Sequence, residues 1–184
     1  MKKIVLFLAF IFSGFLMIAQ DGQGGVKLFA DKQHSYIKYK MYHPMHSWVG
    51  ISRDVNSVIL YDKQNGKILE VAVKTKVSSF DSKNANRDSH MIEVTEALKY
   101  PYITFVSTAI EDEGDKVKVT GVLQFHGVKK TISFEAQKKD AANKIRVSGG
   151  FVVKVTDFDI ELPALLGVPI KDKIEVSFDV YYKK

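Results

Sequence analysis

The chain has 184 residues, of which 46% are hydrophobic, 26% charged and 11% aromatic. These values suit one folded domain with a sizeable core, and they exclude both a multidomain chain and a chain that is disordered throughout. The formal net charge is +6, but the basic residues are scattered among acidic and apolar ones, so we do not expect a nucleic-acid partner.

The first 19 residues have the pattern of a secretory signal peptide. Two lysines precede an uncharged apolar run over residues 4–18, and a polar, glycine-rich stretch follows. The run is shorter than the roughly 20 residues of a membrane-spanning helix, although a retained anchor is the alternative. We therefore expect cleavage of residues 1–19, a single domain over residues 20–184, and a periplasmic or secreted location.

Most of this domain alternates apolar and polar residues, which is typical of strands with one buried and one solvent-facing side. The connections Asn65–Gly66 and His126–Gly127 have the chemistry of tight antiparallel turns, and they predict a meander. Because the chain has no cysteine, no disulfide supports the fold and the core must do so. The alternating segments are 37–41, 69–77, 103–105, 117–125, 132–136, 145–155 and 174–182.

Two stretches interrupt the alternation. Residues 88–98 carry apolar side chains at helical spacing, with Asp88 as the expected N-cap and Pro101 beyond the end, so they predict a short helix. Residues 156–172 contain two prolines and are too apolar for a simple solvated loop. We expect this second segment to cover an opening or to line a cavity.

The pattern predicts an all-β fold in which about eight strands close into an antiparallel barrel. A barrel of this size either fills its interior with side chains or holds one small ligand, and the pattern alone leaves both open. Side chains predicted to point inward are Ile37, Tyr39, Val73, Phe105, Leu123, Phe125, Phe134, Phe151 and Phe178. Side chains predicted to point outward are Glu70, Lys74, Lys76, Glu135, Lys154 and Glu175.

Several motifs in order carry a family resemblance. They are V-S-S-F-D at 77–81, N-R-D-S-H-M at 86–91, Y-P-Y-I-T-F at 100–105, V-T-G-V-L-Q-F-H-G-V at 119–128 and D-F-D-I at 157–160. On these motifs the chain resembles the YceI-like lipid- and polyisoprenoid-binding proteins. The resemblance implies a lipocalin-like extended barrel that is exported to the periplasm and carries a long isoprenoid or other amphiphilic lipid, without enzymatic activity and without a cofactor.

The resemblance, joined to the inward pattern, also predicts where the lipid binds. Its tail is expected along the inward aromatic side chains, and its head group near His43, His46, Trp48 or the segment 158–168. A carrier of this kind makes at most transient membrane contact, and the oligomeric state and the identity of the lipid stay open. The predicted ligand-binding residues are Ile37, Tyr39, His43, His46, Trp48, Val73, Phe105, Leu123, Phe125, Phe134, Phe151, Phe158, Leu165 and Phe178.

Three features of the sequence are also compatible with other functions. His43 and His46, joined by His90 or His126, have the residue types of a zinc or copper site. Such a site needs three or four ligands, which without cysteine would have to come together from different strands, so we predict no metal. A small outer-membrane barrel is a further alternative, disfavoured by the many Lys and Glu residues on the polar faces. The sequence Arg87-Asp88-Ser89-His90 permits acid–base chemistry, but a structural role at the start of a helix explains it as well.

Overall fold

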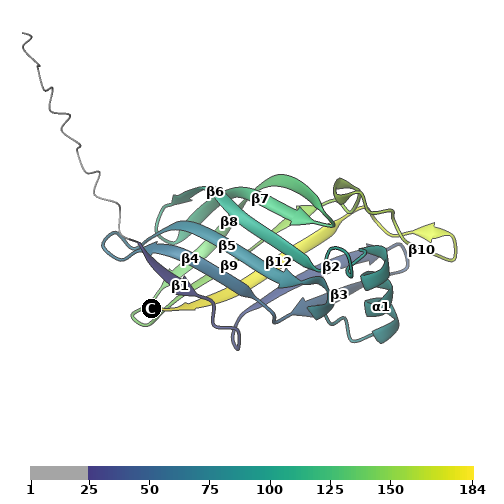
Figure 1. Ribbon diagram of the computed structural model, residues 1–184, viewed down its shortest axis with the longest axis horizontal. Helices are drawn as coiled ribbons and strands as arrows, with labels where there is room; N and C mark the ends of the chain where they lie inside the picture. Colours follow the sequence, from purple (N-terminus) through teal and green to yellow (C-terminus); the bar gives the residue numbers. More distant parts are fainter. Residues whose placement is uncertain (1–24) are drawn as a thin grey trace, which may run out of the picture.

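The computed structural model describes residues 25–184, so the predicted signal peptide lies outside the described residues. Within these residues, ten antiparallel strands form one strongly curled sheet in the order β1-β4-β5-β6-β7-β8-β9-β12-β2-β3, which confirms the predicted all-β fold (Figure 1). The strands are β1 (Val26–Phe29), β2 (Tyr36–His43), β3 (His46–Ser52), β4 (Asn56–Asp62), β5 (Lys67–Lys76), β6 (Tyr102–Asp112), β7 (Lys116–Phe125), β8 (Val128–Asp140), β9 (Lys144–Val153) and β12 (Ile174–Lys183). A separate small hairpin pairs β10 (Ala164–Leu165) with β11 (Val168–Pro169).

Single bridges, rather than full strand ladders, connect the two edge strands of the curled sheet to other parts of the chain. Ala30, just after β1, pairs with Tyr182 of β12, and Ile51 of β3 pairs with Asp81 beyond β5. Strands β4 to β9 form the expected meander, but β12 inserts between β9 and β2, and the sheet has more strands than the eight predicted. The difference arises because β1 has only four residues, and β3 and β4 lack a clear alternation, since β4 contains the continuous apolar run 58–61.

The helix lies close to its predicted place, with different ends. Helix α1 spans Ala85–Val94 instead of 88–98, and its N-cap is Asn84, whose side chain accepts the backbone N–H of Arg87 at 3.0 Å. Asp88, the predicted cap, instead accepts the N–H of Ser82. In the part of the chain that the structure describes, no helix has the length and apolar character needed to cross a membrane.

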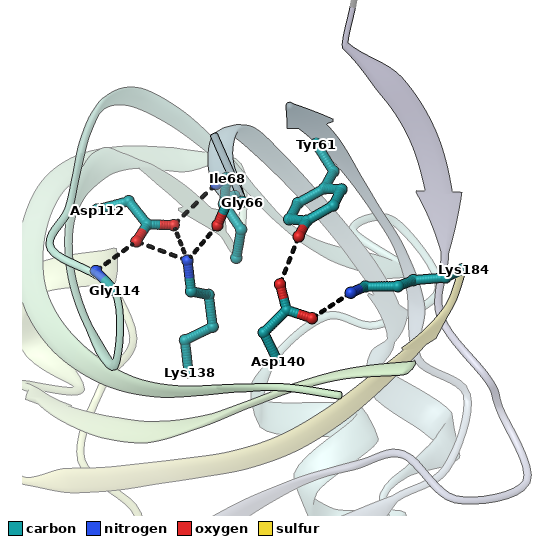
Figure 2. Close-up of polar contacts among 8 residues, drawn as sticks. All are labelled: Tyr61, Gly66, Ile68, Asp112, Gly114, Lys138, Asp140 and Lys184. Carbon is teal, nitrogen blue, oxygen red and sulfur yellow. Dashed lines mark hydrogen bonds and ion pairs between the residues drawn. The ribbon is translucent and has the colours of Figure 1, made fainter. Parts of the chain in front are cut away.

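The two ends of the elongated molecule differ. Helix α1 and the β10–β11 hairpin lie at one end, and the C-terminus and the β4–β5 turn lie at the other (Figure 1). Polar groups fasten the strand connections at the C-terminal end, where Lys138 of β8 reaches the carbonyl of Gly66 and the carboxylate of Asp112 (Figure 2). Beside this pair, Asp140 accepts from the Tyr61 hydroxyl and pairs with Lys184.

Candidate functional site

A cavity of about 480 Å³ occupies the interior of the curled sheet. Almost all of its wall is aliphatic or aromatic, contributed by the inward faces of the strands and by the segment between β9 and β12. Its volume falls within the roughly 300–1,000 Å³ of small-molecule sites in proteins. The sequence left open whether side chains fill the interior or leave room for a ligand. The structure has an interior with room for a ligand.

Phenylalanines from four strands form the middle of the wall. The ring of Phe134 on β8 lies 5.5 Å from Phe105, 5.2 Å from Phe151 and 5.7 Å from Phe178, centroid to centroid. These separations are typical of favourable aromatic pairs. The rings pack against one another on the wall and still leave the cavity open, so the interior is narrowed but not filled.

The period-two pattern placed the wall residues correctly. All nine side chains predicted to point inward line the cavity, and none of the six predicted to point outward does so. The fourteen predicted ligand-binding residues likewise all lie on the wall, with Leu165 near its edge and half exposed to solvent. Their contact with a lipid stays a prediction.

Three aromatic residues of the β2–β3 hairpin stand in a row at the edge of the cavity. The ring of His46 lies 5.3 Å from that of His43 and 5.6 Å from that of Trp48. His43 is buried; its Nδ1 accepts the N–H of Met45 at 3.3 Å, and its Nε2 faces the carbonyl oxygen of Val168 at 3.2 Å. This network assigns the neutral Nε2–H tautomer, with both nitrogens engaged.

The environment of the histidines does not resemble a metal centre. In residues 25–184, no three His, Asp or Glu side chains gather in a way that could hold a metal ion. His126, one of the further candidate ligands, contacts Glu96 and the carbonyl of Phe158 instead. His43 would have to give up its bond to Met45 or to Val168 before it could bind a metal.

Two polar residues of α1 also line the cavity, and the sequence did not predict this. Arg87 and His90 are three residues apart on the helix, so they share a face. The guanidinium carbon of Arg87 lies 5.4 Å from the centre of the Trp48 ring, a cation–π distance. The R-D-x-H motif in the sequence contains both residues. However, only the packing of α1 against the barrel end shows which of its side chains face inward.

The segment between β9 and β12 lines the cavity as expected, although part of it is exposed. Phe158 is fully buried and packs against Phe125 at 5.4 Å, and Ile160 and Ile170 are buried beside it. The connection Leu166–Gly167 lies at the tip of the β10–β11 hairpin and faces solvent, so this part is not a cover.

His126 fastens the buried part of that segment. Its Nδ1 lies 2.8 Å from the carbonyl oxygen of Phe158, and its Nε2 lies 2.8 Å from a carboxylate oxygen of Glu96, just beyond α1. Both partners are acceptors, so both ring nitrogens must carry hydrogen for both bonds to form. His126 thereby links the helix end to the segment over the cavity.

Tyr39 supplies a hydroxyl to the wall of the cavity. Burial raises the pKa of Tyr39 to about 12, and the charge of Asp88 acts in the same direction. The phenol therefore stays neutral at physiological pH and can donate a hydrogen bond. Its ring lies against Phe80 at 5.4 Å and against the backbone of Gly50 on β3.

Comparison with known proteins settles the family. The sequence model of the YceI-like domain matches residues 29–182, which is most of the chain. This protein belongs to the YceI-like family. The chain is 32% identical to Protein YceI of Escherichia coli O157:H7 over 143 residues, covering 74% of this chain and 73% of that protein. It is 30% identical to Protein YceI of Salmonella agona over 141 residues, with the same coverage.

Solved structures of YceI-like and similar folds share the architecture. BcnA of Burkholderia cenocepacia matches with a TM-score of 0.73 at 19% identity, over 83% of this chain and 98% of that one. The Campylobacter jejuni YceI protein matches with a TM-score of 0.64 at 27% identity, over 73% and 84%. A polyisoprenoid-binding domain from Saccharophagus degradans matches with a TM-score of 0.68 at 16% identity, over 85% and 97%. These proteins therefore share the fold with this chain at low sequence identity to it.

Proposed function

We propose that this YceI-like protein is a non-enzymatic carrier that binds a long-chain isoprenoid or other amphiphilic lipid inside the barrel. The observation that carries the proposal is the apolar cavity of about 480 Å³. Burial of each CH₂ group contributes about 0.8 kcal/mol, so a long tail gains binding energy along such a wall without any reaction. The polyisoprenoid-binding domain of Saccharophagus degradans, which shares the fold, supports the same ligand class.

The direction of the apolar faces favours a carrier over an outer-membrane barrel. A membrane barrel presents an apolar band to lipid on its outer surface. Here the outer faces of β5 and β8 carry Lys74, Lys76 and Glu135, all exposed, while the phenylalanines point into the cavity. Export through the N-terminal signal sequence, followed by residence in the periplasm or outside the cell, completes the proposal.

The proposed carrier also meets a membrane, where it collects or delivers its lipid. The β10–β11 hairpin projects from the α1 end of the molecule (Figure 1), and Leu166 at its tip is 88% exposed. Lys171 and Lys173 follow the hairpin, with their ammonium groups 6.0 and 5.6 Å from the centre of the Tyr42 ring. An apolar tip beside basic side chains suits an anionic lipid surface.

Mass spectrometry of an organic extract tests lipid carriage. The full chain is expressed with its signal sequence, purified without detergent from the exported fraction, and extracted. We expect an amphiphilic lipid with one long tail in near-equal amount to the protein, and an N-terminus at Gln20. An extract without lipid, together with failure of the emptied protein to take up added isoprenoids or fatty acids, would refute the carrier function.

A further inference from the structure

The fixed charge on the described cavity wall is positive. Of the described residues that line it, all within 25–184, only Arg87 bears a permanent charge, because none of them is Asp, Glu or Lys. The other polar side-chain groups there are tyrosine and threonine hydroxyls, histidine rings and the indole N–H of Trp48. A head group that enters this cavity therefore meets one fixed positive charge on the wall, while the negative charge of Asp88, which acts on Tyr39, lies behind the wall.

The guanidinium of Arg87 has few partners within the protein. Its Nη1 donates to the hydroxyl of Ser82 at 3.3 Å, and its central carbon lies over the Trp48 ring, 5.4 Å from the ring centre. Within residues 25–184, no carboxylate oxygen lies within 4.0 Å of it. The neighbouring Asp88 forms its hydrogen bonds elsewhere: both of its carboxylate oxygens accept the backbone N–H of Ser82, at 3.2 Å.

Local structure holds Arg87 in this place. The side chain of the N-cap Asn84 accepts the backbone N–H of Arg87, which fixes the first turn of α1 at the barrel end. His90 lies one turn further on the same face and also lines the cavity, where a ring N–H can add a donor beside the guanidinium. The row of His43, His46 and Trp48 borders the same region from the β2–β3 hairpin.

From this arrangement we infer that the head group of the carried lipid is anionic, a carboxylate or a phosphate, and that Arg87 binds it. The planar guanidinium can bind two oxygens of such a group at once, and a charge-assisted hydrogen bond is about twice as strong as a neutral one. The tail then extends from α1 towards the phenylalanines of the wall. This inference rests on the proposed carrier function and specifies the class of its ligand.

Matched pairs of ligands test the inference. Protein freed of lipid is loaded with Nile red, an uncharged probe, and the probe is displaced at pH 8 by hexadecanoic acid or hexadecanol, and by farnesyl phosphate or farnesol. We expect at least one anion to bind about tenfold or more tightly than its alcohol, the size of effect that charge-assisted hydrogen bonds produce. Fluorescence of Trp48, the single tryptophan, should change with that anion.

Variants assign the effect to one side chain. Arg87→Gln should remove the preference, so that anion and alcohol bind about equally, and its loading with Nile red shows that the cavity is intact. Arg53→Gln is the matched control, because Arg53 is exposed and does not line the cavity. Arg87→Lys should keep part of the preference, since it keeps the charge without the planar fork.

The outcomes separate this inference from the carrier function. Preference for the carboxylate, the phosphate or both, lost in Arg87→Gln, supports the inference and identifies the kind of head group. Equal binding of anion and alcohol, or a preference that survives Arg87→Gln, would overturn the role of Arg87 and leave lipid carriage standing. Failure of all four compounds to displace the probe would overturn both proposals.

Discussion

The ammonium group of Lys138 and the carboxylate of Asp112 form an ion pair, 2.6 Å at its shortest, with side chains that are only 3% and 2% exposed. Lys138 also donates to the carbonyl of Gly66, and Asp112 accepts the backbone N–H groups of Ile68 and Gly114 (Figure 2). The pair thus joins β8 to the β4–β5 and β6–β7 connections, at the end of the barrel away from α1. All its strong donors and acceptors are matched, as a buried pair requires.

Removal of the charge of Asp112 should destabilise the fold strongly. Asp112→Asn leaves the ammonium of Lys138 buried without its counter-ion, which costs about 3–5 kcal/mol of unfolding free energy. The neighbouring Glu111 offers a matched control, because its pair with Lys118 is exposed and Glu111→Gln should cost less than about 1 kcal/mol. Urea unfolding at pH 7 measures both, and similar small losses in the two variants would contradict a structural role for the buried pair.

A charge on the cavity wall should expel the lipid. Phe151 stacks on Phe134 inside the cavity, whereas its neighbour Val152 on β9 points outward and is 58% exposed. Phe151→Glu places an unpaired carboxylate in the apolar wall, which is costly, so lipid should no longer copurify. Val152→Glu introduces the same charge on the outer face and should retain the lipid. Circular dichroism verifies that both variants fold, and retention of lipid by folded Phe151→Glu would contradict the proposed location of the tail.

The alternation in the sequence was sufficient to predict which strand side chains point inward, but not whether they fill the interior or leave a cavity. A strand places every second side chain on the same face, so one apolar residue in register fixes the others, as for Phe134 and Ala136 on β8. Lys138 continues that inward face, yet nothing local in the sequence shows that Asp112 would meet it from another hairpin. Such a partner is set by how the strands pair across the barrel.

The ends of the barrel were harder to predict than its middle. Two bridges there join residues that are separated in the sequence, Ala30 with Tyr182 and Ile51 with Asp81, and no local sequence pattern predicts them. The position of Arg87 on the wall has the same origin, because the turn chemistry that begins α1 does not determine how the helix packs against the barrel. The helix begins earlier than predicted, at Ala85, because Asn84 caps it in place of Asp88.

A methyl group at Gly50 should disturb the cavity through Tyr39. A Cβ built at Gly50 would lie 2.3 Å from the Tyr39 ring, a distance that no relaxed contact permits. Gly50→Ala should therefore cost about 1–3 kcal/mol of unfolding free energy, as overpacking does, and lower the lipid content. Adding Tyr39→Leu should restore much of the loss, and a double-mutant cycle measures this coupling. Additive effects of the two changes would show that they do not act on the same contact.

Alkaline pH should weaken the fold through buried tyrosines. Burial raises the pKa of Tyr182 from 10.0 to about 12, against the smaller opposing effect of its hydrogen bond with Ser57. The folded chain favours the neutral phenol, so this stabilisation is fully present below pH 10 and is lost as the pH rises towards 12. Urea unfolding at pH 8, 10 and 11 should show a smaller decline for Tyr182→Phe than for the unchanged protein. Equal declines would exclude Tyr182 as a cause.

Membrane contact through the β10–β11 hairpin should depend on one exposed leucine. Leu166 has a positive φ of 52°, a backbone conformation that Asp tolerates better than Leu, so Leu166→Asp should not weaken the hairpin itself. The substitution removes the apolar tip and adds a negative charge, and it should reduce binding to phosphatidylglycerol vesicles by about tenfold or more, given the 1.5–3 kcal/mol that burial of a leucine contributes.

The control for that experiment is Phe29→Asp. Phe29 is also exposed, but it lies beside Lys183 near the C-terminus, away from the hairpin. Vesicle cosedimentation should show that Phe29→Asp binds like the unchanged protein and that added salt weakens binding, because Lys171 and Lys173 act through charge. Phosphatidylcholine vesicles should bind less protein than phosphatidylglycerol vesicles for the same reason. If Leu166→Asp sediments with phosphatidylglycerol vesicles as fully as Phe29→Asp, the hairpin is not the membrane contact.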